Sequence, residues 1–178
     1  MRRRCGQRRA YTLIEVIIVM TIIAIAAAIV VPQMLKAGTM TAQAAGRSII
    51  ADLLWAQNDA IARQRPRRVT FDSANDLYKV EKDTDGDGTW EPIPAQWRTG
   101  NTNTGNYEVD FNVDSRYVGV EIVSAEFPDA EHNYIDYDDI GSPSTGGNVV
   151  IESQGTRYRI DVTPMTGRVT ITNVTAGG

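Results

Sequence analysis

A run of 21 almost wholly apolar residues near the N-terminus, Tyr11 to Val31, constrains this chain more than any other feature. At about 1.5 Å per residue, a helix of that length is about 30 Å long, which matches the hydrocarbon core of a membrane. Five of the fifteen arginines lie in the ten residues before the run, and none in the fifteen residues after it. The positive-inside bias therefore predicts a single-pass helix with a cytoplasmic N-terminus and an exported remainder.

The charge and the rare residues of the chain exclude several classes of function. Without residues 1–10 the chain has 13 Lys and Arg against 22 Asp and Glu, a net charge of −9. Residues 11–178 are therefore too acidic to present the broad positive surface that drives binding to phosphate backbones, and we do not expect nucleic acid as a partner. The chain has one cysteine, Cys5, and one histidine, His132. We therefore expect no internal disulfide, no cysteine-based metal cluster and no enzyme.

Glu15 is the one charged residue within the apolar run. A carboxylate in a spanning helix costs about 2 to 3 kcal/mol toward the bilayer centre unless it is hydrated, neutralised or paired. Cleavage between Ala10 and Tyr11 would create a cation at a similar depth, because the new amino group is positive near neutral pH. A parallel helix staggered by about one turn would bring the amine of one subunit to the carboxylate of its neighbour. Glu15 then serves assembly, and hydration near the membrane surface is the alternative.

The residues around Glu15 resemble a known processing signal. A basic leader is followed by Ala10-Tyr11-Thr12-Leu13-Ile14-Glu15 and an unbroken apolar helix, which resembles the class III signal of type IV pilins and type II secretion pseudopilins. The resemblance implies cleavage after Ala10 by prepilin peptidase, N-methylation of Tyr11 and packing of the helix into a filament core. Family members usually carry Gly and Phe at the two positions that flank the cut. Pro32 stands where many of them have a proline that kinks the helix.

An ordinary secretory signal is the competing interpretation of the same segment. The small residues Ala24, Ala26 and Ala28 would then mark a signal-peptidase site, and a free soluble domain would result. Glu15 inside the apolar region and the apolar residues 29–31 after the alanines argue against this interpretation.

The residues after Pro32 change from one periodicity to another. Apolar residues recur every three or four positions to about Arg65, which predicts an amphipathic continuation of the helix that Pro66 ends. Trp55 is expected to pack on the exported domain. From Val69 the period is two, with turn residues between the runs. The expected strands are 68–71, 77–82, 107–113, 118–126, 148–153, 158–163 and 168–174.

These elements predict an α+β fold. A long N-terminal helix, transmembrane in its first half, packs on a C-terminal antiparallel β-sandwich-like domain, as in the pilin fold. Segments 99–106 and 128–147 are expected to be polar loops. The expected organisation is a basic leader 1–10, a transmembrane helix 11–31, an amphipathic continuation 32–65 and a periplasmic β-rich domain 66–178.

The order of the later segments resembles one branch of the pilin-like proteins. An alanine-rich helix with residues 53–54 and 60–63 leads into Val69-Thr70-Phe71, and residues 158–162 and 166–169 close the chain. This succession resembles the H-type minor pseudopilins of type II secretion and their FimT relatives in type IV pili. It implies a structural subunit that assembles with other pilin or pseudopilin subunits, first in the bacterial inner membrane and then in a filament. The alternatives are a minor pilin of a type IV pilus and a secreted calcium-binding domain. Thr170 stands where DNA-binding FimT proteins usually have arginine, which argues against a role in DNA uptake.

An acidic segment is the candidate metal site. Asp83, Asp85 and Asp87 alternate with small residues as in the start of an EF-hand loop, but the twelfth position is Pro94 and strands flank the segment. A hairpin loop could still bind Ca²⁺ through Asp83, Asp85, Asp87 and Glu91, and a solvated turn is the alternative. No cofactor is required.

Two further charged groups are expected to be structural. The acidic group comprises Asp136, Asp138, Asp139 and Glu131, and we expect it in a solvent-facing loop. The basic group comprises Arg63, Arg65, Arg67 and Arg68. These arginines are expected to stabilise the C-terminal end of the helix dipole, and contact with an acidic loop of a neighbouring subunit is the alternative.

Overall fold

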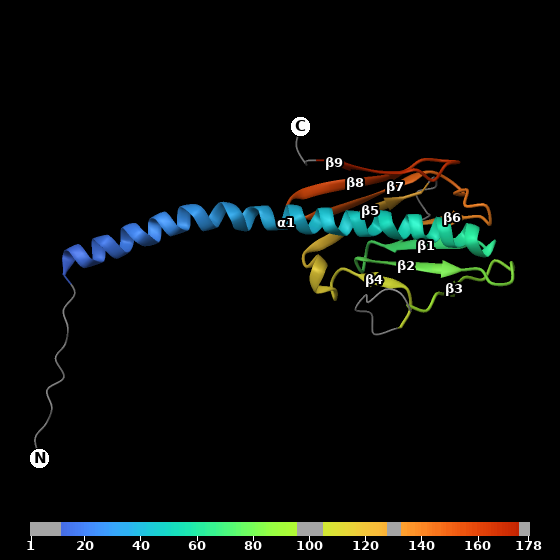
Figure 1. Cartoon of the computed structure of the whole chain (residues 1–178), viewed down its shortest axis with the longest axis horizontal. Coiled ribbons are helices and arrows are strands. Elements are labelled where there is room, and N and C mark those ends of the chain that lie inside the picture. The colour runs from blue at the N-terminus through green and yellow to red at the C-terminus, as the bar shows by residue number, and fades with distance from the viewer. Residues whose placement is uncertain (1–11, 96–104, 128–132, 175–178) are drawn as a thin grey trace, which may run out of the picture. The chain divides into compact units, whose positions relative to one another are not determined.

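The computed structural model describes residues 12–95, 105–127 and 133–174, and of residues 31–39 it describes the backbone only (Figure 1). The chain divides into two units, residues 1–36 and 37–178, and each is described by itself. The leader and the two residues at the predicted cut, Ala10 and Tyr11, lie outside the described residues.

One long helix, α1 (Leu13–Arg63), forms the N-terminal part of the fold. The backbone is helical through Pro32, and the kink expected there stays a prediction. The helix ends just before Pro66, as the sequence predicts. Gln64 has a φ of 51° and the amide of Arg65 donates to the carbonyl of Ala60 at 3.2 Å, the left-handed termination common at helix ends.

Nine strands in two antiparallel sheets follow the helix within the described residues. The first sheet has the order β3-β2-β1-β6, with β4 also paired to β2, and the second has the order β5-β7-β8-β9. A short 3-10 helix, η1 (Ser115–Tyr117), precedes β5. The strands are β1 (Arg67–Asp72), β2 (Leu77–Lys82), β3 (Glu91–Pro92), β4 (Glu108–Asp110), β5 (Val120–Glu126), β6 (Tyr134–Tyr137), β7 (Gly147–Ser153), β8 (Thr156–Val162) and β9 (Val169–Asn173).

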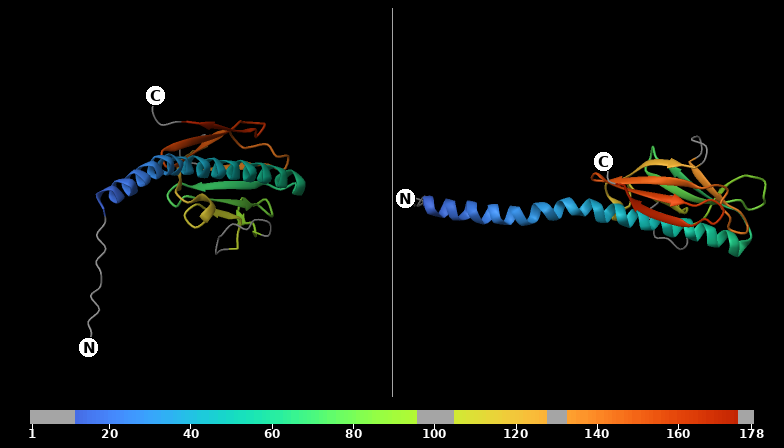
Figure 2. Two further views of the ribbon diagram at one scale, coloured as in Figure 1. Left: turned by 60° about the vertical axis from the view of Figure 1, so that its left-hand side comes forward. Right: turned by 90° about the horizontal axis from the view of Figure 1, so that it is seen from above.

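The core lies where α1 meets both sheets, and Figure 2 shows the helix along one side of them. The face of α1 that is fully buried consists mostly of alanine, which lets the backbone of the helix approach the strands. A Cβ added at Gly46 would stand 2.6 Å from Cδ1 of Ile171 on β9, so the helix and the second sheet pack closely at this point. The fully buried residues of the helix are Ala42, Ala45, Ile49, Leu53, Ala56 and Ala60. The α+β class is therefore confirmed, with the helix covering the two sheets.

The prediction of a polar loop over 128–147 was wrong for β6. Ile135 and Tyr137 are buried, and β6 pairs with β1 so that Val69 lies opposite Ile135. Four residues are too short a run for alternation to stand out within a polar stretch. Predicted strand 107–113 is also shorter in the structure, where only β4 (Glu108–Asp110) is extended.

Asp136 lies on β6 and not in a solvent-facing loop, which corrects the expectation for that residue. Its carboxylate accepts hydrogen bonds from Nε and Nη2 of Arg68 at 2.6 and 2.7 Å. The same guanidinium lies over the rings of Trp90 and Tyr134, 4.2 and 3.6 Å from their centroids. Burial lowers the pKa of Arg68, but the hydrogen bond and the charge of Asp136 outweigh it and leave the pKa raised. Asp138 and Asp139 are exposed as expected, and Glu131 lies outside the described residues.

Candidate functional site

The first candidate site is the start of α1. The segment Leu13–Val30 has a mean hydropathy of 2.9 and no buried residue, so by length and composition it can cross a membrane. Glu15 lies in its first turn, where its amide donates to the carbonyl of Thr12 at 3.1 Å and its side chain is exposed. No other residue of Leu13–Val30 is charged. A cation for this carboxylate therefore has to come from outside the segment.

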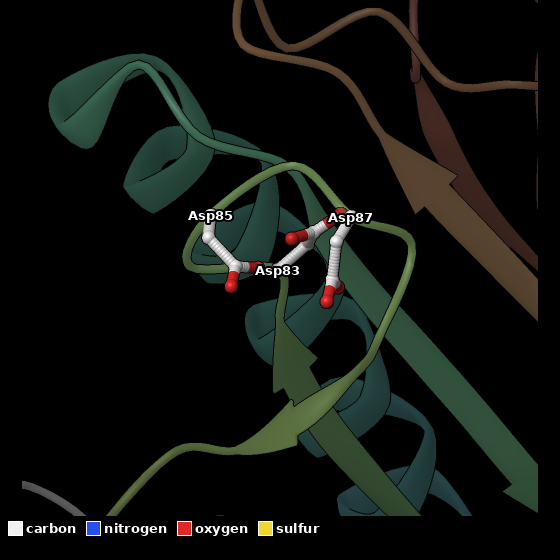
Figure 3. A group of neighbouring side chains, drawn as sticks. All are labelled: Asp83, Asp85 and Asp87. Carbon is white, nitrogen blue, oxygen red and sulfur yellow. The ribbon is translucent and has the colours of Figure 1, made fainter.

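The second candidate site is the loop between β2 and β3, where three carboxylates come together (Figure 3). One oxygen each of Asp83, Asp85 and Asp87 lies within 4.8 Å of the others. Asp83 is 6% exposed and shapes the loop, since its two oxygens accept hydrogen bonds from the amides of Gly86 and Gly88 at 2.7 and 3.1 Å. Both glycines have positive φ, 78° and 81°, which explains their place in this turn.

The predicted fourth ligand, Glu91, is not brought into this group. Its Oε2 accepts a hydrogen bond from the Thr84 hydroxyl at 2.6 Å and lies 3.4 Å from Nζ of Lys82. The hydrogen bond from Thr84 lowers the pKa of Glu91, and a hydrogen bond from the Thr89 amide lowers the pKa of Asp87. Both carboxylates are therefore ionised at neutral pH. Of the four predicted ligands, the structure brings three together, Asp83, Asp85 and Asp87.

The third candidate site is a cavity at the C-terminal end of α1, which the sequence did not indicate. It has a volume of about 590 Å³ and is lined by α1, the start of β1, the end of β2 and the segment after β3. Trp55 forms an apolar wall and stacks on Tyr107, with ring centroids 4.7 Å apart, so the prediction that it packs on the domain is confirmed. Four of the lining residues are cations: Arg63, Arg65, Arg67 and Lys82.

The arginines near the helix end, apart from Arg65, pair with carboxylates. Asp59 accepts hydrogen bonds from Nε of Arg63 at 2.8 Å and from Nε of Arg67 at 2.7 Å. The side chain of Arg67 is 3% exposed and also donates to the carbonyls of Arg65 and Pro66. These two carbonyls follow the last residue of α1, Arg63, so the expected stabilisation of the helix end stays a prediction. The side chain of Arg65 has no ion pair within the described ranges.

A buried polar network is a further feature that the sequence analysis missed. The carboxylate of Asp52, 4% exposed, accepts hydrogen bonds from the hydroxyls of Tyr78 and Tyr107, the latter at 3.0 Å. The hydroxyl of Tyr117 donates to Ser48 at 2.9 Å. Burial raises the pKa of Tyr78 well above its usual value, which keeps the phenol a donor. The sequence signal for this network was the spacing of Asp52, three residues after Ile49 and four before Ala56. That spacing places a carboxylate on the buried face of the helix, where it needs hydrogen-bond donors.

Comparisons with known proteins identify two segments of the chain. Residues 5–31 match the model of the prokaryotic N-terminal methylation motif, and residues 45–167 match the model of type II transport protein GspH. A comparison with curated proteins found no match.

Solved structures also resemble this fold. The minor pseudopilin EpsH from the type 2 secretion system of Vibrio cholerae is 15% identical, with a TM-score of 0.49, over 77% of this chain and 98% of that chain. The type IV minor pilin FimU of Pseudomonas aeruginosa is 14% identical, with a TM-score of 0.49, over 74% of this chain and 87% of that chain. The assignment rests on the family model, which covers more than half of the sequence: the chain belongs to the GspH family of type II transport proteins.

Proposed function

We propose that this chain is a minor pseudopilin of a type II secretion system, a structural subunit with a mechanical role. The observation that carries the proposal is the presence of two matched segments in one chain. The methylation motif covers the second half of the leader and the apolar helix, and the GspH model covers most of the domain that follows.

Processing prepares the subunit for assembly in this proposal. Prepilin peptidase removes the leader after Ala10 and methylates the new amino group of Tyr11. That amino group lies four residues before Glu15, about one helical turn away. The amine of one subunit and the carboxylate of its neighbour then neutralise each other at one depth of the membrane.

The charge of the leader supports a defined orientation. Its five arginines stay in the cytoplasm, the segment Leu13–Val30 crosses the inner membrane, and the β-rich domain lies in the periplasm. From there the subunit joins other pilin-like subunits through α1. The alternative of a minor pilin in a type IV pilus shares these steps and differs only in the machine that is served.

We expect the protein from membranes of a cell with its own prepilin peptidase to begin at N-methylated Tyr11. The measurement is the N-terminal sequence and the intact mass of the purified chain. A peptidase-deficient strain is the control, and it should yield the chain with its leader. A start beyond Ala26 in a soluble protein would contradict the proposal and favour signal peptidase. Co-precipitation with tagged secretion or pilus subunits then separates the two machines.

We also propose that the β2–β3 loop binds Ca²⁺. Three carboxylates with oxygens inside 4.8 Å support this proposal, because hard oxygen ligands are what Ca²⁺ prefers. Loop carbonyls and water would have to complete the shell, since Glu91 is engaged with Thr84 and Lys82. Such a partial set of ligands suits the weak affinity of extracellular calcium modules, a Kd of about 0.3 mM.

Calcium is expected to stabilise the domain measurably. At about 10 mM Ca²⁺ a site of that affinity adds about 2 kcal/mol to the free energy of unfolding. The measurement is thermal unfolding of the purified chain with Ca²⁺, with Mg²⁺ and with a chelator. The Asp85→Asn, Asp87→Asn double variant should lose the effect, and the matched Asp138→Asn, Asp139→Asn variant should keep it. Equal shifts in both variants would show that the loop is a solvated turn.

A further inference from the structure

The cavity at the C-terminal end of α1, which we call the helix-end pocket, carries more positive than negative charge. The cations of its lining are Arg63, Arg65, Arg67 and Lys82. Asp59 is shared between Arg63 and Arg67, and Glu91 lies 3.4 Å from Nζ of Lys82. Two carboxylates therefore pair with three of the four cations, and the three aspartates of the adjacent β2–β3 loop lie outside the lining. This excess of positive charge favours an anionic ligand.

Arg67 is the buried cation of the helix-end pocket, and its pairing is incomplete. Its side chain is 3% exposed, its Nε donates to Asp59 at 2.7 Å, and its Nη1 donates to two backbone carbonyls. Its Nη2 has no hydrogen bond within the described ranges, yet it is not sealed from solvent. A buried charge is costly unless its donors are satisfied. Because Arg67 lines the pocket, its open donors favour an anion there.

Arg65 adds a second guanidinium to the lining. Its side chain is exposed, and it pairs with no carboxylate in the part of the chain that the structure describes. A guanidinium matches the planar shape of a carboxylate, and a donor that is already fixed loses little conformational freedom on binding. The pocket thus combines a fixed guanidinium, Arg67, with an adjustable one, Arg65.

Apolar side chains line the same pocket beside the cations. Trp55 and Ile93 are half-buried and pack against the core, and the stacking of Trp55 on Tyr107 holds the indole in place. An inorganic anion would leave this apolar surface in water, whereas a side chain next to the carboxylate would cover it. A volume of about 590 Å³ has room for more than one side chain. The pocket therefore fits a peptide segment with a carboxylate beside an apolar group.

We propose that the helix-end pocket binds an acidic segment of a different pilin-like subunit. An Asp or Glu of that subunit accepts hydrogen bonds from Arg65 and Arg67, and the apolar residue beside it packs on Trp55 and Ile93. The contact joins two different proteins, so it defines one neighbour of this chain and needs no second copy. It rests on the proposed function, because the neighbours of a minor subunit in the fibre are other pilin-like proteins.

Titration of the purified full chain in detergent tests the recognition with defined probes. The probes are the capped tripeptide Leu-Asp-Leu, its neutral counterpart Leu-Asn-Leu and inorganic phosphate. The readout is the indole N–H resonance of Trp55, which Trp55→Phe assigns. Leu-Asp-Leu should shift this resonance to saturation, and the other two probes should bind about ten-fold more weakly. Trp90 lies over Arg68 and outside the lining, so its resonance should not move.

Charge reversal tests the cation that carries the recognition. Arg65→Glu should lower the affinity for Leu-Asp-Leu about ten-fold, because a pairing guanidinium becomes a repelling carboxylate. Arg47→Glu is the matched control and should leave the affinity unchanged. Arg47 is an exposed arginine of the same helix, outside the lining and without an ion pair among the described residues. Thermal unfolding should be the same for both variants and the wild-type chain, which shows that the fold is intact.

Photo-cross-linking in the cell identifies the partner segment. Pro94 is exposed and lines the pocket, so p-benzoylphenylalanine in its place leaves all four cations unchanged. Irradiation of cells that contain the secretion machine should join this chain to a different pilin-like protein. The cross-linked peptide should hold an Asp or Glu beside an apolar residue. Arg65→Glu should lower the cross-linked fraction about ten-fold, and Lys in place of that acid of the partner should restore it.

Several results with the probes would overturn the inference. Equal shifts with Leu-Asp-Leu and Leu-Asn-Leu would show that the pocket does not recognise the carboxylate. Phosphate bound as tightly as the acidic peptide would make the pocket a site for small anions only. An affinity that Arg65→Glu leaves unchanged would remove the proposed role of this cation.

The results in cells separate the inference from the proposed function. A cross-link to a second copy, to a lipid or to a peptide without an acid would overturn the inference. A chain that starts at methylated Tyr11 and joins the filament without any cross-link overturns the inference alone. A chain that keeps its leader overturns the proposed function, and the assignment of the partner to a pilin-like subunit then fails with it.

Discussion

Replacing Asp52 with alanine is expected to lower the free energy of unfolding of the β-rich domain by about 3 kcal/mol. The carboxylate accepts from the hydroxyls of Tyr78 and Tyr107, and all three residues are buried. Without it, two phenol groups lose their shared acceptor inside the core, and each buried polar group left unpaired costs about 1 to 3 kcal/mol. A small cavity adds to the loss.

Denaturant unfolding of the full chain in detergent measures this effect. Trp55 stacks on Tyr107 and so gives a fluorescence signal close to the network. Tyr107→Phe is the matched control, because it removes one hydroxyl and keeps the carboxylate and the ring, and it should cost about 1 kcal/mol. A loss for Asp52→Ala no larger than that of the control would show that the carboxylate is not the shared acceptor.

Coupling between Asp52 and Tyr78 gives a second test of the same network. In the wild-type chain, Tyr78→Phe removes a donor from a buried carboxylate and should destabilise the domain. In the Asp52→Ala background the phenol has lost this acceptor, so removing its hydroxyl should cost little or even stabilise. The two changes should therefore be non-additive by about 1 to 2 kcal/mol. Additive effects would place the two residues in separate environments.

The parts of the fold that the sequence predicted are those with long or repeated patterns. α1 carries its periodicity over many turns and ends near a proline, and the predicted strands 77–82 and 148–153 match β2 and β7 within one residue. β6 was missed because its four residues owe their strand to pairing with β1 and not to their own pattern. The ion pair between Arg68 on β1 and Asp136 on β6 was missed for the same reason, because it depends on the pairing of two segments far apart in the chain.

The candidate sites that the sequence predicted are likewise those whose residues are near one another in the chain. Asp83, Asp85 and Asp87 are near in sequence, so a short turn is enough to bring their oxygens together as predicted. Glu91 lies on the opposite strand of the hairpin, where it accepts a hydrogen bond from Thr84 and pairs with Lys82 instead of joining the three aspartates. The cavity at the C-terminal end of α1 and the Asp52 network join residues from α1 to residues many positions later. Their existence depends on how the helix lies on the sheets, which no local pattern specifies.

Replacing Glu15 with glutamine is expected to lower incorporation of the subunit into the filament about 100-fold while leaving it in the membrane. Glutamine keeps the shape of the side chain and removes its charge. An unpaired charged group within the membrane costs about 2 to 3 kcal/mol, and pairing with a neighbouring subunit removes this cost. That free energy corresponds to about two orders of magnitude in the affinity between subunits. Insertion itself should not suffer, because the segment Leu13–Val30 becomes less polar.

Three readouts on one preparation distinguish assembly from the earlier steps. Membrane fractionation should show the Glu15→Gln chain in the membrane, and its intact mass should show whether cleavage still occurs after Ala10. Co-precipitation with a tagged filament subunit should then fall for a chain that is processed and inserted. Thr21→Val is the matched control in the same helix, since among the described residues the Thr21 hydroxyl bonds to the carbonyl of Ile17 alone, and it should assemble normally. Normal incorporation of a processed Glu15→Gln chain would assign the carboxylate to hydration at the membrane surface.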